Sequence, residues 1–469
     1  MRNPMKSFSP SVAALAMMLV LVSAAHGADA AFDWKSLEDR AVSWLSRYIQ
    51  IDTTNPPGNE IKAARFFKEI FDREGIDAHI IESAPGRGNI YAKLRGDGSK
   101  KAVLLLNHMD VVPADAKLWK EPPFSGGIKE GAIWGRGAID NKGGGIIALM
   151  TLLALKHQKL NGDLIFLGTA DEEAGGVLGA GYVLEHHPEL FKDIGVVLNE
   201  GGGIRVGEDG RARLYRIGVA EKVPLWLKLT APGTPGHAAS PGSDQAVLKL
   251  ITALSRIASY QSPIKVVPEV QKFYADSAAS APPGRREPYK DLRRALQNPA
   301  FAAEFLKDRS NNARVRNTIA ITGIKGSDKI NVIPAEASAE IDVRLLPGEE
   351  PHAFIDELHR VVADASIKIE VLLSRAAAIS PASSDALKVI AEYAQAKDPG
   401  TPILLSMGTG FTDCHFFRTQ GIPCLGFLPR RNRPSEAGTV HGIDERVSVE
   451  SLKSAMRAMY EIVGKLIVE

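Results

Sequence analysis

Five short apolar runs constrain the fold of this chain more than any other feature. They cover residues 103–106, 164–167, 195–198, 403–405 and 424–428. A strongly apolar segment of helical length, residues 146–155, lies between the first and second runs. Strands that lack polar alternation and are separated by helices indicate a parallel sheet covered on both faces. We therefore expect an α/β chain built on a mostly parallel sheet flanked by helices.

The pattern changes between the third and fourth runs. Residues 225–230 and 337–343 alternate between apolar and polar side chains, as half-solvated antiparallel strands do. Each is followed by a segment with helical patterning, at residues 244–259 and 352–365. This order predicts a smaller α/β sandwich inserted into the larger domain. Residues 262–316, rich in Pro, Arg and Ala, are expected to form a helical and peripheral insertion within it.

The length of the chain also favours two domains, because 469 residues exceed what one ordinary hydrophobic core organises. The larger domain is expected to be discontinuous, since apolar runs of the parallel type return late in the sequence. Its first part would cover residues 31–220 and its second part residues 376–469. The smaller domain would then occupy residues 221–375.

Residues 1–30 have the pattern of a secretory signal peptide. Arg2 and Lys6 precede a bare apolar run at residues 12–22, and Ala-Asp-Ala at residues 28–30 has the small-x-small form of a cleavage site. A membrane anchor is the competing interpretation, but the run is shorter than the ~20 apolar residues of a spanning helix. We expect a secreted or periplasmic protein that does not contact the membrane after cleavage.

The charge of the chain indicates no polyanionic partner. The formal net charge is +2, and no block of five or more like charges stands out. Neither nucleic acid nor an anionic membrane surface is therefore expected as a partner. The two cysteines, Cys414 and Cys424, lack the spacing of a thiolate zinc site. A disulfide in an oxidising compartment and two free, partly buried thiols are both consistent with the sequence.

Acidic and imidazole side chains follow three of the apolar runs directly or lie in loops rich in glycine. They are His108, Asp110, Asp140, Glu172, Glu173, Glu200 and His441. Because functional groups converge at the carboxyl ends of parallel strands, we expect these side chains in one crevice. Buried carboxylates need cations or protons. Imidazole and carboxylate ligands without thiolates suit zinc, with manganese and cobalt as alternatives.

Each of these residues has an ordinary structural interpretation when it is taken alone. His108 and Asp110 could be a simple hydrogen-bonded pair, and Asp140 could cap a helix. Glu172 and Glu173 could be acids in a first helical turn, favoured by the helix dipole. Together these interpretations fail, because each would have to occur at the same sheet edge by coincidence.

The motifs around these residues resemble those of the M20 metallopeptidases, the group of aminoacylases, glutamate carboxypeptidases and succinyl-diaminopimelate desuccinylases. The resemblance covers nearly all of the chain after the first 30 residues. The matching segments are Leu106–Asp110, Gly135–Gly144, Asp171–Glu173, Asn199–Gly202, Pro235–His237 and Val440–Gly442. Each motif alone is unspecific, but the combination is highly specific.

The resemblance implies a centre of two divalent metal ions, Zn²⁺ before Co²⁺ or Mn²⁺. Asp140 would bridge the two ions through its two oxygens. His108 and Glu200 would complete one site, and Glu173 and His441 would complete the other.

The resemblance also implies catalytic roles. Two metals ~3.5–4 Å apart would hold a bridging water and lower its pKa toward ~7. Glu172 would be the general base that takes the proton of this water and delivers it to the leaving amine. Asp110 would hydrogen-bond the His108 ring and fix its tautomer. His237 would be a lid histidine that donates to the developing oxyanion, in the closed site or in that of a partner subunit.

Further residues match the family's substrate contacts. Asn331 and Arg344 correspond to lid residues that grip substrate, and Arg344 could hold a carboxylate with a bidentate fork. Gly410 and Thr412 lie in a loop that resembles the glycine-rich substrate loop of the family. Phe411 departs from that pattern, so the resemblance does not define the shape of the pocket.

The first hypothesis is therefore a secreted hydrolase that cleaves the amide bond of small peptides or N-acyl amino acids. It would act as a carboxypeptidase, a dipeptidase or an aminoacylase. The alternatives are a non-hydrolytic, metal-containing peptide receptor and a hydrolase of a non-peptide amide. The resemblance further implies a homodimer formed through the lid domain, residues 221–375. The insertion at 262–316 could instead cover that surface or help to wall the cleft.

Overall fold

The structure is a computed structural model that describes residue 1 and residues 33–468. The predicted signal peptide lies outside the described residues, apart from Met1, and stays a prediction. The described residues divide into two units, one up to residue 40 and one from residue 41 onward, and the fold and the site below lie in the second. Among the described residues, no helix is both long and apolar enough to span a membrane.

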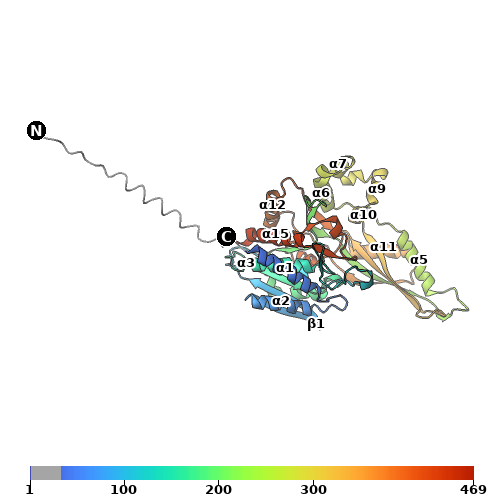
Figure 1. Cartoon of the computed structure of the whole chain (residues 1–469). Helices are drawn as coiled ribbons and strands as arrows, with labels where there is room; N and C mark the ends of the chain where they lie inside the picture. Colours follow the sequence, from blue (N-terminus) through green and yellow to red (C-terminus); the bar gives the residue numbers. More distant parts are fainter. Residues whose placement is uncertain (2–32, 469) are drawn as a thin grey trace. The chain divides into compact units, whose positions relative to one another are not determined.

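A ten-stranded mixed sheet, counted within residues 33–468, forms the core of the larger unit (Figure 1). Its parallel centre contains four of the five predicted runs and has the strand order β6 (Leu164–Thr169), β3 (Ala102–His108), β7 (Ile194–Asn199) and β17 (Cys424–Gly426). The fifth run, β16 (Ile403–Gly408), pairs parallel with β9. The remaining strands are β2 (Arg87–Leu94), β1 (Asp77–Ala84), β9 (Ala212–Glu221), β8 (Gly203–Val206) and β18 (Arg431–Asn432). The expected parallel sheet is thus confirmed, with antiparallel pairs toward its edges.

Helices cover both faces of this sheet, as the apolar character of its strands predicts. They include α2 (Ile61–Arg73), α3 (Lys142–Leu155), α4 (Tyr182–His186), α13 (Cys414–Thr419) and α15 (Val449–Ile467). On one face, the ring centroid of Phe166 lies 4.9 Å from that of Phe67 on α2. On the other face, Leu167 packs in a cluster with Phe417 of α13. Burial on both sides leaves only the strand ends open to solvent and ligands.

A separate antiparallel sheet contains the strands with alternating sequence. Its order is β12 (Thr318–Lys325), β14 (Glu336–Leu345), β10 (Val223–Pro232) and β15 (Lys368–Ser374). The two predicted helices are α5 (Ala246–Ser259) and α11 (Pro351–Val362). Their apolar residues pack with those of β10 and β14 in one buried cluster. This region is consistent with the predicted inserted domain, whose boundaries stay a prediction.

The segment 262–316 is helical, as expected, and it packs on the large sheet. Its helices are α6 (Pro268–Ser277), α7 (Pro283–Lys290), α8 (Leu292–Ala295), α9 (Pro299–Leu306) and α10 (Arg309–Arg314). Their buried aromatic and aliphatic side chains form one cluster with Ala220 of β9 and Met407 of β16. The insertion therefore lies beside the strands that carry the loops of the site.

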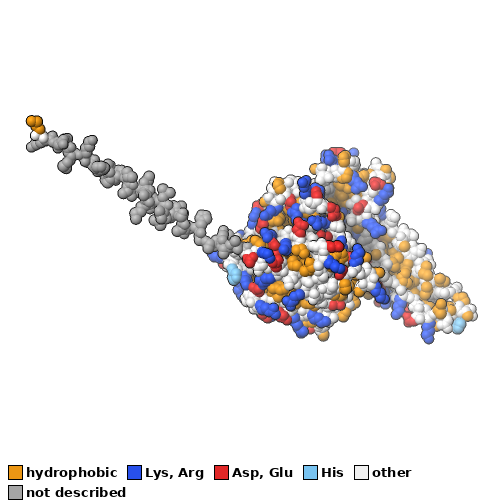
Figure 2. All heavy atoms as spheres, in the orientation of Figure 1, with side chains coloured by type: hydrophobic (Ala, Val, Ile, Leu, Met, Phe, Trp, Pro, Cys, Tyr) orange, Lys and Arg blue, Asp and Glu red, His pale blue; other side chains and the backbone are white. Residues whose placement is uncertain are grey.

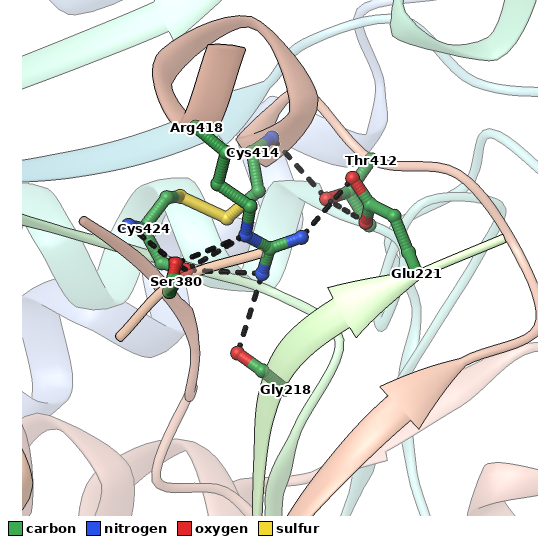
Figure 3. Close-up of a disulfide and its surroundings, with 7 residues drawn as sticks. All are labelled: Gly218, Glu221, Ser380, Thr412, Cys414, Arg418 and Cys424. Atoms are coloured by element: carbon green, nitrogen blue, oxygen red, sulfur yellow. Dashed lines mark hydrogen bonds and ion pairs between the residues drawn. A yellow bond between two sulfur atoms is a disulfide. The ribbon is translucent and has the colours of Figure 1, made fainter. Parts of the chain in front are cut away.

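Cys414 and Cys424 form a disulfide, which decides between the two interpretations that the sequence left open (Figure 3). Both cysteines are fully buried. Arg418 lies beside the bond and donates from Nη2 to the carbonyl oxygen of Cys424 at 2.9 Å. Its Nη1 also lies 3.2 Å from Oε1 of Glu221. The disulfide thus links helix α13, which follows the predicted substrate loop, to the central strand β17.

We expect this disulfide to stabilise the fold. Replacing both cysteines with Ala removes a cross-link between residues 10 apart in sequence, which should lower the free energy of unfolding by about 3 kcal/mol through the greater entropy of the unfolded chain. Urea denaturation measures the difference. Reduction of the wild type with a phosphine should cause the same loss and leave the double variant unaffected. Equal stability of oxidised and reduced wild type would contradict this expectation.

Candidate metal centre

Three neighbouring strand ends bring the predicted residues together. His108 is the last residue of β3, Glu200 directly follows β7, and Glu172 opens a 3-10 turn just after β6. Because β6, β3 and β7 are parallel neighbours, their carboxyl ends lie at one edge of the sheet. His108 and Glu172 are only 2% and 8% exposed. The structure therefore confirms the convergence that the strand pattern predicts.

Asp140 lies between the two predicted histidines. Its Oδ1 is 3.0 Å from Nε2 of His108, and its Oδ2 is 3.1 Å from Nε2 of His441. Glu200 approaches the same His108 nitrogen at 3.2 Å, and Glu173 approaches the same His441 nitrogen at 3.2 Å. Two groups of three ligand atoms, sharing Asp140, are thus each close enough to hold one ion.

The carboxylates favour positive charge on both sides of Asp140. Hydrogen bonds to Asp140 and Glu173 raise the pKa of His441 to about 10. Burial opposes a charge on His108, but Glu200 and the neighbouring carboxylates outweigh it and raise the pKa of His108 well above its ordinary value. The two histidines in turn hold the pKa of Asp140 well below its usual range, despite the burial of that group.

Burial also affects the remaining carboxylates of the site. Burial raises the pKa of Glu172 well above its usual range and raises that of Glu200 to about 7. Within residues 33–468, no Lys or Arg forms an ion pair with Glu172, Glu173 or Glu200. Buried acids with imidazoles as their only close cationic partners form a donor set that fits divalent ions such as zinc.

Asp110 has a wider role than the predicted contact with His108. The Nδ1 atom of His108 lies 3.0 Å from the backbone oxygen of Asp110 and 3.5 Å from its carboxylate. The carboxylate oxygens accept the backbone N–H groups of Glu172 and Glu173, each at 3.1 Å. Asn55 donates to the same carboxylate at 2.8 Å. Asp110 therefore positions the turn that carries both glutamates, as well as the His108 ring.

Glu445, which no sequence motif marks, positions the loop of Asp140. This fully buried carboxylate accepts the backbone N–H groups of Ile139 at 2.8 Å, Asp140 at 3.0 Å and Gly137 at 3.1 Å. It also pairs with Arg136 at 2.7 Å. The only sequence signal was its place shortly after His441, in a segment that alone suggests a polar loop.

A cavity of about 460 Å³ opens over the metal centre and includes several predicted substrate contacts. Arg344, Gly410 and Thr412 line it, as does Trp226, which was not among the predicted site residues. Trp226 occupies an outward position of β10, where a polar residue would be usual. A large aromatic residue at such a position is the sequence signal for a functional role of Trp226. The Nε and Nη2 atoms of Arg344 bind Asp342 at 2.8 and 3.0 Å.

Two predicted lid residues, His237 and Asn331, do not join this cavity. The exposed His237 ends strand β11 (Gly236–His237), and the exposed Asn331 directly precedes its partner strand β13 (Val332–Ile333). The Nδ1 atom of His237 accepts the backbone N–H of Ala239 at 3.1 Å. Neither side chain is among the residues that line the cavity in a single chain. The expected closed arrangement within one chain is therefore not present in this structure.

Comparison with known proteins defines the class. The model of Peptidase family M20/M25/M40 matches residues 104–465. The chain therefore belongs to this family and is an amide-bond hydrolase of the M20 peptidase and aminoacylase type. This result removes the alternative of a non-hydrolytic receptor.

Individual relatives agree with this assignment. The human N-fatty-acyl-amino acid synthase/hydrolase PM20D1 is 28% identical over 414 residues, which cover 85% of this chain and 80% of the relative. Human aminoacylase-1 is 25% identical, with 87% and 91% of the two chains covered. The structure of an M20 family metallo-carboxypeptidase from Sulfolobus solfataricus has the same fold, with a TM-score of 0.70, 20% identity, and 91% and 98% coverage.

Loss of the Glu445 charge should weaken metal binding. Glu445→Gln removes the ion pair with Arg136 and weakens the acceptor that fixes the Asp140 loop, so we expect a 10- to 100-fold fall in metal affinity. Competition with a fluorescent chelator measures this affinity. Glu450→Gln is the control, because Glu450 pairs with Arg433 at the surface. Unchanged affinity in Glu445→Gln would show that Glu445 does not support the centre.

Proposed function

We propose that this protein is a secreted di-metal hydrolase that cleaves the amide bond of N-acyl amino acids or small peptides. The main support is the position of Asp140. Its Oδ1 lies 3.0 Å from Nε2 of His108, and its Oδ2 lies 3.1 Å from Nε2 of His441. A carboxylate in this position can serve two cations at once. His108 and Glu200 would hold one ion, and Glu173 and His441 would hold the other, with zinc as the proposed metal.

Bound ions would supply Lewis acidity toward the scissile carbonyl and lower the pKa of a water molecule. Glu172 would perform the proton transfers. It lines the cavity beside Asp140 and Glu200, and its burial raises its pKa, so it can accept and hold a proton. The attacking water forms a C–O bond, and its proton passes through Glu172 to the nitrogen as the C–N bond breaks. The products are a carboxylic acid and an amine.

The local backbone conformation allows the adjacent side chains of Glu172 and Glu173 to have different roles. They lie in a 3-10 turn, η2 (Glu172–Ala174), which follows Asp171 in a left-handed conformation with φ of 71°. Glu173 reaches His441, whereas Glu172 has no such partner among the described residues and lines the cavity. One side chain is therefore available for proton transfer while its neighbour holds a ligand position.

The relatives favour N-acyl amino acids and peptides as substrates. Two of them are named for hydrolysis of acylated amino acids, and a third, from Dictyostelium discoideum, is a probable carboxypeptidase S-like protein with 27% identity. Such substrates carry a carboxylate beside the scissile amide. We propose that Arg344 receives this carboxylate, since it lines the cavity and has a planar fork that suits the group.

We also propose that the protein is exported. The motif at residues 1–30 has the form of a signal peptide. The disulfide between Cys414 and Cys424 supports this, because structural disulfides persist in oxidising compartments and are rare in reducing ones.

We also propose a homodimer formed through the four-stranded sheet and helix α5. Strand β12 is an edge strand, and Ile324 on it is 69% exposed. Leu248 and Ile251 on α5 are 53% and 55% exposed, and Figure 2 shows hydrophobic side chains at the surface in the region of α5. A dimer would cover these groups and could bring His237 of each subunit to the cavity of the other.

Substitution of Glu172 tests the mechanism. Glu172→Gln keeps the size of the side chain but cannot accept the proton, so kcat should fall at least 10²-fold on N-acyl amino acids. Calorimetric zinc titration should give an unchanged stoichiometry, since Glu172 is not a proposed ligand. Chelation should abolish wild-type turnover, and zinc or cobalt should restore it. Undiminished turnover in Glu172→Gln, or full activity after chelation, would contradict the proposed function.

Complementation tests the dimer. Co-expressed Glu172→Gln and His237→Ala chains would form mixed dimers in which one site has both an intact Glu172 and an intact His237 from the other chain. Random pairing should restore about a quarter of wild-type activity, although each variant alone is nearly inactive. Light scattering of the wild type should give twice the chain mass. A monomeric mass and no restored activity would contradict the shared site.

A further inference from the structure

A second cavity, of about 240 Å³, adjoins the cavity over the metal centre. The two cavities share Glu200, Gly201 and the loop residues 409–412 as lining. The second cavity therefore adjoins the first at the proposed metal ligand Glu200 and at the substrate loop. Arg344 lines only the first cavity.

Besides Arg418, three arginines from three separate elements line the second cavity: Arg205 on β8, Arg216 on β9 and Arg314 at the end of α10. In the antiparallel register, Arg205 lies opposite Leu214, two residues before Arg216. Arg205 and Arg216 are thus diagonal neighbours on one face of the sheet. Arg314 reaches the same space from the helical insertion.

Small residues keep this space open. Gly218 and Ala220 follow Arg216 along β9, and both line the cavity. Longer side chains at these positions would fill the volume beneath the guanidinium groups. The face of β9 therefore combines positive charge with an open volume beside it.

None of the three arginines has a carboxylate partner within residues 33–468. The cavity has only two acids in its lining. Glu221 pairs with Arg418 at 3.2 Å, and Glu200 is a proposed metal ligand. The buried Nε of Arg314 lacks a hydrogen-bond partner.

The arginines also act on one another. Burial, together with the charges of Arg205 and Arg314, lowers the pKa of Arg216 to about 10. Like charges brought together from three elements repel one another, and an anion bound between them would relieve this repulsion. Planar guanidinium groups bind carboxylates with paired hydrogen bonds.

We propose that this arginine cavity binds a carboxylate on the acyl part of the substrate. The inference rests on the proposed function, in which Arg344 receives the carboxylate beside the scissile amide. Since Arg344 lines the other cavity, the two carboxylates would lie on opposite sides of the bond that is cleaved. The preferred substrate would then be an amino acid whose N-acyl group ends in an acid, such as succinyl or glutaryl, and Arg314 would give the 262–316 insertion a role in specificity.

Matched substrates test this assignment. For one amino acid, the metal-loaded full chain is assayed with an N-succinyl and an N-butanoyl group, which have the same carbon count and differ by the terminal carboxylate. We expect kcat/KM to be at least tenfold higher for the succinyl substrate. Arg216→Gln and, separately, Arg314→Gln should lower this ratio at least tenfold. Arg213→Gln is the control on the same strand, because Arg213 pairs with Asp209 at the surface.

Two results would overturn the assignment while leaving the proposed hydrolase intact. One is a wild-type ratio of the two kcat/KM values near one. The other is an equal fall of kcat/KM for both substrates in the arginine variants. If neither substrate is cleaved, the proposed hydrolysis of N-acyl amino acids fails for that amino acid, and a binding measurement decides the inference. Calorimetric titration with glutarate should show at least tenfold weaker binding to Arg216→Gln than to Arg213→Gln. Equal affinities would overturn it.

Discussion

The concentration of carboxylates at one sheet edge is the constraint on which the site depends. Asp140, Glu172, Glu173 and Glu200 meet there with only imidazoles as close cationic partners in the described chain. Such a group of acids is unfavourable in a partly buried crevice unless cations accompany it. The surrounding structure is organised to keep these side chains in place despite their mutual repulsion.

That organisation uses buried acids as acceptors for backbone N–H groups. Glu445 fixes the loop of Asp140 through three such bonds, and Asp110 fixes the turn of Glu172 through two. Arg430 donates to the carbonyl oxygen of Ile139 at 2.7 Å and holds the same loop from its other side. The geometry of the centre therefore results from contacts of buried side chains with main-chain groups 62 to 308 residues away in sequence.

Much of this arrangement is predictable from sequence, because parallel strands place their following residues at one edge. His108, Glu172 and Glu200 were predicted on that basis, and the two predicted sheets are both present. The role of Glu445 was not predictable, since its partners are backbone groups that have no sequence signature. Trp226 was overlooked in an alternating strand. His237 and Asn331 matched the family by motif, but their exposed position shows that motif alone does not give their place in the site.

The most direct test of a metal pair bridged by Asp140 is a crystal structure of the zinc-loaded protein with anomalous diffraction at the zinc edge. We expect two zinc peaks about 3.5–4 Å apart, each bound by one oxygen of Asp140, with His108 beside one and His441 beside the other. A single peak, or peaks that do not contact Asp140, would contradict a bridged pair of metal ions.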